Sequence, residues 1–123
     1  MNDKTIEQEI QAKGLNAPRV TPGDIEAEID SEWYIIAADG VPHDGFHAPV
    51  GAVSPLRQLT FCVLILRNGF TVTGESACAS PENFDAEIGR KIARQNAVAK
   101  IWPLLGFRLR DELTALPDHP GLG

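Results

Sequence analysis

The sequence predicts an α+β fold in which a small antiparallel sheet packs on one long helix, with short helices at the N-terminus. Two strand-like apolar runs within residues 57–80 are separated by Asn68-Gly69, the preferred pair for a tight hairpin turn. Residues 80–102 follow with apolar side chains at helical spacing. A hairpin followed by a long helix indicates mixed rather than alternating α and β segments.

The whole chain is expected to form one domain, because 123 residues suffice for a single modest core. Residues 1–20 are predicted to be an N-terminal helix or arm. Ile6 and Ile10 lie one helical turn apart there, and Gly14 can end the helix. Residues 117–123 are predicted to be a disordered tail, since they hold two prolines and two glycines.

A second helix is expected to begin at Thr21, which can cap it, with Pro22 at its first position. Asp24 completes a pattern like a capping box. Residues 32–40 fit either a continuation of this helix or a short buried strand. Residues 39–56 hold three prolines and three glycines, which is typical of a long functional loop.

The hairpin gives the most specific local prediction. If Asn68 and Gly69 form a two-residue type I′ turn, Arg67 pairs with Phe70. In that register the core face carries Leu59, Phe61, Val63, Ile65, Phe70, Val72 and Cys78. The opposite face carries Cys62, Leu64 and Leu66 against Thr71, Thr73, Glu75 and Ala77. The first strand is therefore apolar on both faces, so we expect it to be central in its sheet or covered by a neighbouring chain.

The long helix is expected to begin with Ser80 as its cap and Pro81 at its first position. Its predicted apolar band comprises Phe84, Ile88, Ile92, Ala93, Ala97 and Ile101. Pro103 should end or kink the helix, and residues 104–116 should add one or two further turns.

The charge distribution narrows the classes of partner. The net charge of −6 argues against binding of long DNA or RNA, which needs a basic surface. Residues 1–50 hold three basic and ten acidic side chains, whereas six of the eleven basic side chains lie within residues 90–110. Such a local positive zone suits a small anionic ligand or an acidic partner, although a solvated helix face gives the same pattern. No apolar run approaches the length of a membrane span, so we expect no membrane partner and a cytoplasmic protein.

Two motifs resemble a catalytic site and a metal site, but neither matches its pattern completely. Residues 74–78, "GESAC", resemble a nucleophile elbow, yet the second glycine is replaced by Cys78 and the predicted helix begins too late. We therefore expect Ser76 and Cys78 to be small core residues, and a hydrolase using either ranks last among the functions considered. His43, Asp44 and His47 could bind a metal, but a closed site would need a fourth ligand. Lining of a pocket or a subunit interface is the alternative for this loop, and we expect no cofactor.

The beginning and outer face of the long helix favour anion binding. Free N–H groups at a helix N-terminus attract anions, and Arg90 and Arg94 lie one turn apart on the helix. Asn96 can read the edge of a base, and Phe84 can stack on one. Together with Arg108 and Arg110 these side chains are typical of a small nucleotide pocket. The alternative is that the arginines form salt bridges to the acidic N-terminal half.

The segment "LTFCVLILRNGFTVTGESACASPENFDAEIGRKIARQNAVAKIWPLLGFRL" resembles the core of a family of small tailed-phage and prophage proteins, the gene-49/gene-66 phage protein family. The resemblance extends to "QAKGLNAPRVTP" and "YIIAADGV". The chain is also similar, in its size and in its hairpin followed by a helix, to the phage anti-Thoeris sponge proteins. Those proteins bind cyclic ADP-ribose-type signals without catalysis and act as oligomers.

The resemblance implies a non-enzymatic antagonist of host anti-phage defence, located in the cytoplasm of the infected bacterium. Such a protein would sequester a nucleotide second messenger, of the cyclic ADP-ribose type or a cyclic oligonucleotide, and would form a homo-oligomer. The ligand-binding residues that the resemblance suggests are Arg57, Phe84, Arg90, Arg94, Asn96 and Arg110. The alternative is a phage protein-interaction module that binds a host or phage protein through its acidic N-terminal face and takes no small ligand.

Overall fold

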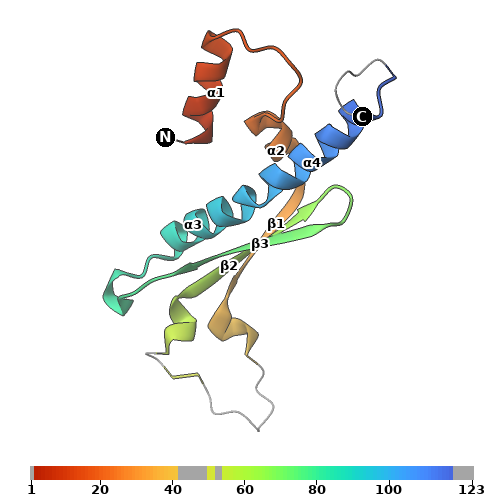
Figure 1. Ribbon diagram of the computed structural model, residues 1–123. Coiled ribbons are helices and arrows are strands. Elements are labelled where there is room, and N and C mark those ends of the chain that lie inside the picture. Colours follow the sequence, from red (N-terminus) through yellow and green to blue (C-terminus); the bar gives the residue numbers. More distant parts are fainter. Residues whose placement is uncertain (1, 42–49, 52–53, 118–123) are drawn as a thin grey trace. The chain divides into compact units, whose positions relative to one another are not determined.

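The computed structural model describes residues 2–41, 50–51 and 54–117. These residues form two compact units (Figure 1). The sheet unit comprises Ile29–Lys100, and the helical unit comprises Met1–Glu28 with Ile101–Gly123. The His43–His47 loop and residues 118–123 of the predicted tail lie outside the described residues.

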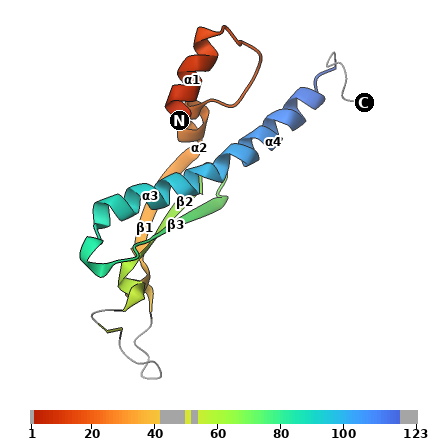
Figure 2. The same cartoon turned by 60° about the vertical axis from the view of Figure 1, so that its left-hand side comes forward.

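The sheet unit contains three antiparallel strands in the order β1-β2-β3, with β1 at Ile29–Ile36, β2 at Leu59–Leu66 and β3 at Thr71–Ala77. The helix α3, Ala86–Ala99, lies along one face of this sheet (Figures 1 and 2). The described part of the unit also contains three 3₁₀ turns: η1 at Ala37–Gly40, η2 at Pro55–Gln58 and η3 at Pro81–Asn83. β2 is the central strand, as its two apolar faces predicted, and residues 32–40 form a strand followed by a 3₁₀ turn.

The predicted two-residue turn is wrong by one residue. Leu66 and Phe70 pair instead, and the N–H of Gly69 donates to the carbonyl of Leu66 over 2.9 Å. The loop therefore contains Arg67, Asn68 and Gly69, and Gly69 adopts a φ of +87° that a side chain would strain. A three-residue loop ending in such a glycine is the next most common hairpin connection.

The shifted turn also corrects the predicted core face. The buried side chains of β2 are Thr60, Cys62, Leu64 and Leu66, whereas its odd-numbered residues are only half-buried. In the observed register the polar side chains of β3, such as Thr73, lie beside the odd-numbered residues of β2. The alternation of β3 thus identifies the solvent face. Phe70 lies at the turn and is exposed, not in the core.

The band of α3 that faces the sheet is made of small residues. Gly89, Ala93 and Ala97 are buried, whereas Ile88 and Ile92 are exposed, so the prediction that these isoleucines are core residues is wrong. Small side chains on this face allow the helix to approach the sheet closely. The closest approach is at Gly74, where an added Cβ would lie 2.3 Å from backbone atoms of Ala93 and Ala97.

The predicted N-terminus of the long helix is also corrected. Ser80 and Pro81 begin the 3₁₀ turn η3, and the Ser80 side chain makes no capping bond. The N-cap of α3 is Asp85, whose Oδ1 accepts from the N–H of Ile88 over 3.0 Å. A 3₁₀ turn therefore separates the end of β3 from the helix, and α3 is shorter than predicted.

The other face of the sheet is open, and its part over β1 and β2 is apolar. Trp33 and Ile35 of β1 are 58% and 44% exposed. They pair with Val63 and Phe61 of β2, which are half-buried. This open sheet face is the side opposite to α3.

The helical unit consists of α1 at Asp3–Ala12, α2 at Pro22–Glu28 and α4 at Ile101–Thr114. The predicted cap of α2 is confirmed in both directions. The Thr21 hydroxyl accepts from the N–H of Asp24 over 3.1 Å, and the Asp24 carboxylate accepts from the N–H of Thr21 over 2.9 Å. Gly14 follows α1 with a φ of +65°, which explains why that helix ends there.

α4 is longer than the one or two turns predicted. Pro103 lies in its first turn, where a missing N–H removes no bond within α4, and α3 ends just before it, as Pro103 predicted. Ile25 of α2 and Ile101 and Leu105 of α4 are buried. α1 has no buried residue. None of the helices in the described residues is long and apolar enough to cross a membrane.

Candidate functional site

The sheet unit holds a cavity of about 180 Å³ on the side of the sheet that α3 covers in part. It arises because α3 packs mainly on β2 and β3, which leaves the end of β1 beside the helix without cover. Residues of β1, η1, β2 and the first two turns of α3 line it: Tyr34, Ile35, Ile36, Asp39, Thr60, Ala86 and Arg90. All of these residues belong to one unit.

Thr60 is the unusual residue of this cavity. It is the polar side chain of an otherwise apolar strand and is only 2% exposed. Its hydroxyl has no hydrogen-bond partner within the described part of the chain. Gly89 lies over it, since a Cβ at that position would meet the Thr60 hydroxyl oxygen at 3.2 Å. A buried hydroxyl without a partner is destabilising, so it favours a water molecule or a ligand atom in its vicinity.

Arg90 and Asp39 supply the charges of the cavity. Both are exposed, and neither side chain has a hydrogen bond or an ion pair to another of the described residues. A guanidinium offers five N–H donors in a fixed geometry that matches phosphate or carboxylate, whereas a carboxylate only accepts hydrogen bonds. The cavity therefore suits a ligand with an anionic group and a hydroxyl or amino group.

A chain of polar contacts forms the wall beside the cavity. The Tyr34 hydroxyl donates to the Glu32 carboxylate, which also accepts from Arg94 Nε over 3.2 Å. Burial raises the pKa of the Tyr34 hydroxyl, and its hydrogen bond to Glu32 raises it further. Tyr34 thus remains neutral at physiological pH, and Glu32 and Arg94 largely neutralise each other.

The structure brings together only part of the predicted ligand set. Arg90 lines the cavity, and Phe84 lies near it, because its ring edge and the Thr60 hydroxyl both lie close to Gly89. Arg94 is next to the cavity but is paired with Glu32.

The remaining predicted residues lie elsewhere. Asn96 donates to the Glu75 carbonyl over 2.8 Å and so ties α3 to β3, away from the β1 side. Arg57 donates to the carbonyls of Gly51 and Val50 over 2.8 and 2.9 Å, which gives it a local structural role. Arg110 lies on α4, in the helical unit, and is no part of this site.

The alternative of salt bridges to the acidic N-terminal half holds for two of the arginines. Arg94 pairs with Glu32, and Arg108 contacts Glu28 over 2.7 Å within the helical unit. Sequence reasoning missed Thr60, Tyr34 and Asp39, since no motif contains them. A threonine within the apolar run of residues 59–66 was the one available signal.

The residues of the apparent nucleophile elbow have ordinary structural surroundings. Ser76 lies within β3 and pairs with Thr60, not with Phe61 as the predicted register implied. The Cys78 thiol donates to the carbonyl of Ser80 over 3.0 Å, and both cysteines are free. Burial raises the pKa of the Cys62 thiol, which disfavours the reactive thiolate.

Comparison with known families identifies the chain. Residues 20–113 match the model of the phage protein (N4 Gp49/phage Sf6 gene 66) family. The match covers most of the sequence, so the chain belongs to this family, as the hairpin and the long helix predicted. No curated protein and no solved structure matches the chain. A relation to the anti-Thoeris sponge proteins stays a prediction.

Proposed function

We propose that this member of the phage protein family binds and sequesters a small nucleotide signal without catalysis, as an antagonist of host anti-phage defence. The observation that carries the proposal is the pairing, in one cavity, of the unpartnered Thr60 hydroxyl with the unpaired guanidinium of Arg90. Both groups lack partners in the described chain, and a phosphorylated ligand can supply them. The signal is a cyclic ADP-ribose-type molecule or a cyclic oligonucleotide, acting in the cytoplasm of the infected host.

The composition of the cavity supports a nucleotide rather than a bare anion. Asp39 would repel an inorganic anion but can accept a hydrogen bond from a ribose hydroxyl. Arg90 would hold a phosphate, and Tyr34 offers an aromatic surface. A cavity of about 180 Å³ is smaller than typical ligand sites. We therefore expect it to hold a ribose-phosphate portion, with the base outside it and toward Phe84.

Calorimetric titration of the full chain with cyclic ADP-ribose isomers and cyclic di- and trinucleotides tests the proposal. Arg90→Gln should weaken binding by about 10- to 100-fold, because it removes a charge-assisted hydrogen bond. Lys91→Gln is the matched control: it removes the same charge from the next residue of α3, where Lys91 pairs with Glu87 and is not among the cavity residues. Absence of heat with every ligand, or equal effects of the two variants, would contradict the proposal.

A second function is favoured by the open sheet face. Trp33 and Ile35 are 58% and 44% exposed on one face of the same strand, and neighbouring exposed apolar side chains are typical of a protein-interaction site. In this alternative the chain binds a host or phage protein and takes no small ligand. A stoichiometric partner that Trp33→Ser loses and Arg90→Gln retains would favour it, whereas a partner insensitive to Trp33→Ser would not.

A further inference from the structure

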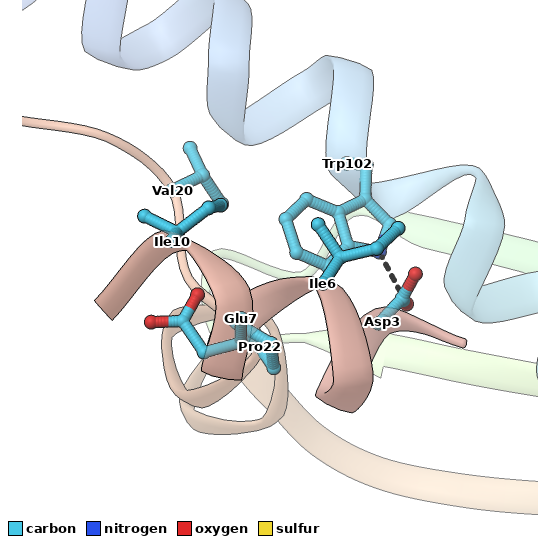
Figure 3. A pocket seen from close by; sticks show the side chains of 7 residues that line it. All are labelled: Asp3, Ile6, Glu7, Ile10, Val20, Pro22 and Trp102. Atoms are coloured by element: carbon cyan, nitrogen blue, oxygen red, sulfur yellow. Dashed lines mark hydrogen bonds between the residues drawn. The ribbon is translucent and has the colours of Figure 1, made fainter. Parts of the chain in front are cut away.

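The helical unit contains a cavity of its own, of about 210 Å³, which we call the groove (Figure 3). Its walls are mainly apolar: Ile6 and Ile10 come from α1, Val20 precedes α2, Pro22 begins α2, and the indole of Trp102 comes from α4. Ile6 lies over the Trp102 ring, and Ile10 and Val20 lie at the other end (Figure 3). The groove stays open because α1 contacts the rest of the helical unit without burying any of its own residues.

The polar groups at the rim are already engaged. Both carboxylate oxygens of Glu7 accept from Arg19 over 2.6 Å, and Asp3 accepts from the Trp102 indole N–H over 3.1 Å. The groove thus offers apolar surface and no free donor, which favours an apolar occupant. Asp3 has no cationic partner among the residues that the structure describes. An occupant with a cation next to its apolar group would therefore be preferred.

The same unit carries a side chain with this chemistry on its outer surface. Phe107 of α4 is 73% exposed, the most exposed large hydrophobic side chain of the described residues. Arg110 follows it by three residues, on the same side of the helix, and its guanidinium has no anionic partner in the described chain. An exposed phenyl ring with a neighbouring guanidinium is complementary to an apolar groove beside a carboxylate that lacks a cationic partner.

The Phe107 side chain cannot enter the groove of its own chain. Phe107 is five residues beyond Trp102, so the two side chains point about 140° apart around α4. The Phe107 ring is directed away from the groove of its own chain, and only another molecule can bring the two together.

We propose that a second copy of this chain inserts its Phe107 into the groove beside Trp102 and sets its Arg110 against Asp3. The size is suitable, since a cavity of roughly 150 Å³ takes a benzene molecule. Phe107 and the groove are different surfaces of one unit, so the contact is head-to-tail and leads to a closed ring or a growing chain of copies. This assembly is independent of the nucleotide cavity, whose residues belong to the sheet unit.

Sedimentation and light scattering of the full chain over a range of concentrations test the inference. The wild-type chain should assemble, and Phe107→Ala should weaken the assembly by at least about 30-fold in dissociation constant, because it removes the central apolar anchor. Phe70→Ala is the matched control. Phe70 is also an exposed phenylalanine, with 54% of its surface accessible, and it lies on the hairpin of the other unit.

A mixing experiment separates a head-to-tail contact from any other. Phe107→Ala lacks the anchor but keeps the groove, whereas Ile10→Arg blocks the groove but keeps the anchor. Each should be monomeric alone, and an equimolar mixture should form dimers and nothing larger. Circular dichroism establishes that Ile10→Arg is folded; if it is not, Val20→Arg takes its place.

The ion pair gives a smaller effect. Asp3→Arg and Arg110→Asp should each weaken assembly by roughly fivefold at most, and the double variant should restore it. A wild-type chain that stays monomeric, an assembly that survives Phe107→Ala, or a mixture that fails to form dimers would overturn the inference. Survival in Phe107→Ala with loss in Trp33→Ser would place the contact on the open sheet face.

Discussion

In the sheet unit, α3 and β3 approach so closely that a Cβ at position 74 would overlap the helix backbone. In the helical unit, α1 has no buried residue and is held by the Glu7–Arg19 ion pair and the bond from Trp102 to Asp3. The first arrangement depends on steric fit, which few substitutions preserve. The second depends on polar contacts at or near the surface, which contribute little each and respond to solvent conditions. The difference indicates a rigid scaffold joined to a unit whose first helix is loosely attached.

The largest expected effect comes from filling the space at Gly74. Gly74→Ala places a Cβ 2.3 Å from the Ala93 carbonyl oxygen and the Ala97 amide nitrogen, so α3 must move. We expect the free energy of unfolding of the sheet unit to fall by about 3 kcal/mol, measured by urea unfolding.

Gly106→Ala is the control for this substitution. An added Cβ there meets nothing within 4 Å, and Gly106 lies within α4. Alanine should therefore stabilise the helix by up to about 1 kcal/mol. If both substitutions changed the free energy of unfolding in the same direction, the effect of Gly74→Ala could not be attributed to the close packing of α3 on β3.

A medium effect is expected at Thr60, whose hydroxyl is buried without a partner. Thr60→Val replaces the hydroxyl by a methyl group of similar size and should raise the free energy of unfolding by about 1 kcal/mol. The same variant should bind the nucleotide more weakly. A loss of stability, measured in the absence of ligand, would show that the hydroxyl already has a partner in the free protein.

The smallest effect concerns acid and the attachment of α1. The hydrogen bond from Arg19 lowers the pKa of the Glu7 carboxyl below its usual value of 4.5. The carboxylate therefore supports the folded state fully above that value, and its contribution is lost as the pH falls through the lower folded-state pKa. The protection of the α1 amides against hydrogen exchange, taken relative to the intrinsic exchange rate at each pH, should fall over this acidic range before that of the sheet. In Glu7→Gln the protection of α1 should already be low at neutral pH and change little on acidification.

The sequence predicted which elements exist better than how they pack. The α+β class, the central position of β2, the caps of α2 and the family could all be read from local patterns. The core face could not, because a turn of three residues instead of two shifts the pairing, and both faces of β2 are apolar. Helical spacing and size predict burial of Ile88 and Ile92, whereas the close approach of helix and sheet selects glycine and alanine for the buried face.

Of the residues in and near the candidate site, the sequence predicted only two: Arg90, which lines the cavity, and Phe84, which lies near it. Arg94 and Asn96 lie on the same helix but contact opposite strands, since positions two apart point in opposite directions. Thr60 and Asp39 come from segments far apart in the chain, and only the fold brings them to one cavity.

The two units also differ in how they use the chain: the sheet unit is one continuous segment, whereas the helical unit combines both ends. During synthesis from the N-terminus, α1 and α2 emerge before the sheet unit, and α4 emerges after it. All of the sheet unit is available before α4 leaves the ribosome, so the sheet unit can fold while the helical unit is still incomplete. The helices α1 and α2 are thus translated before the sheet unit but reach their final structure after it.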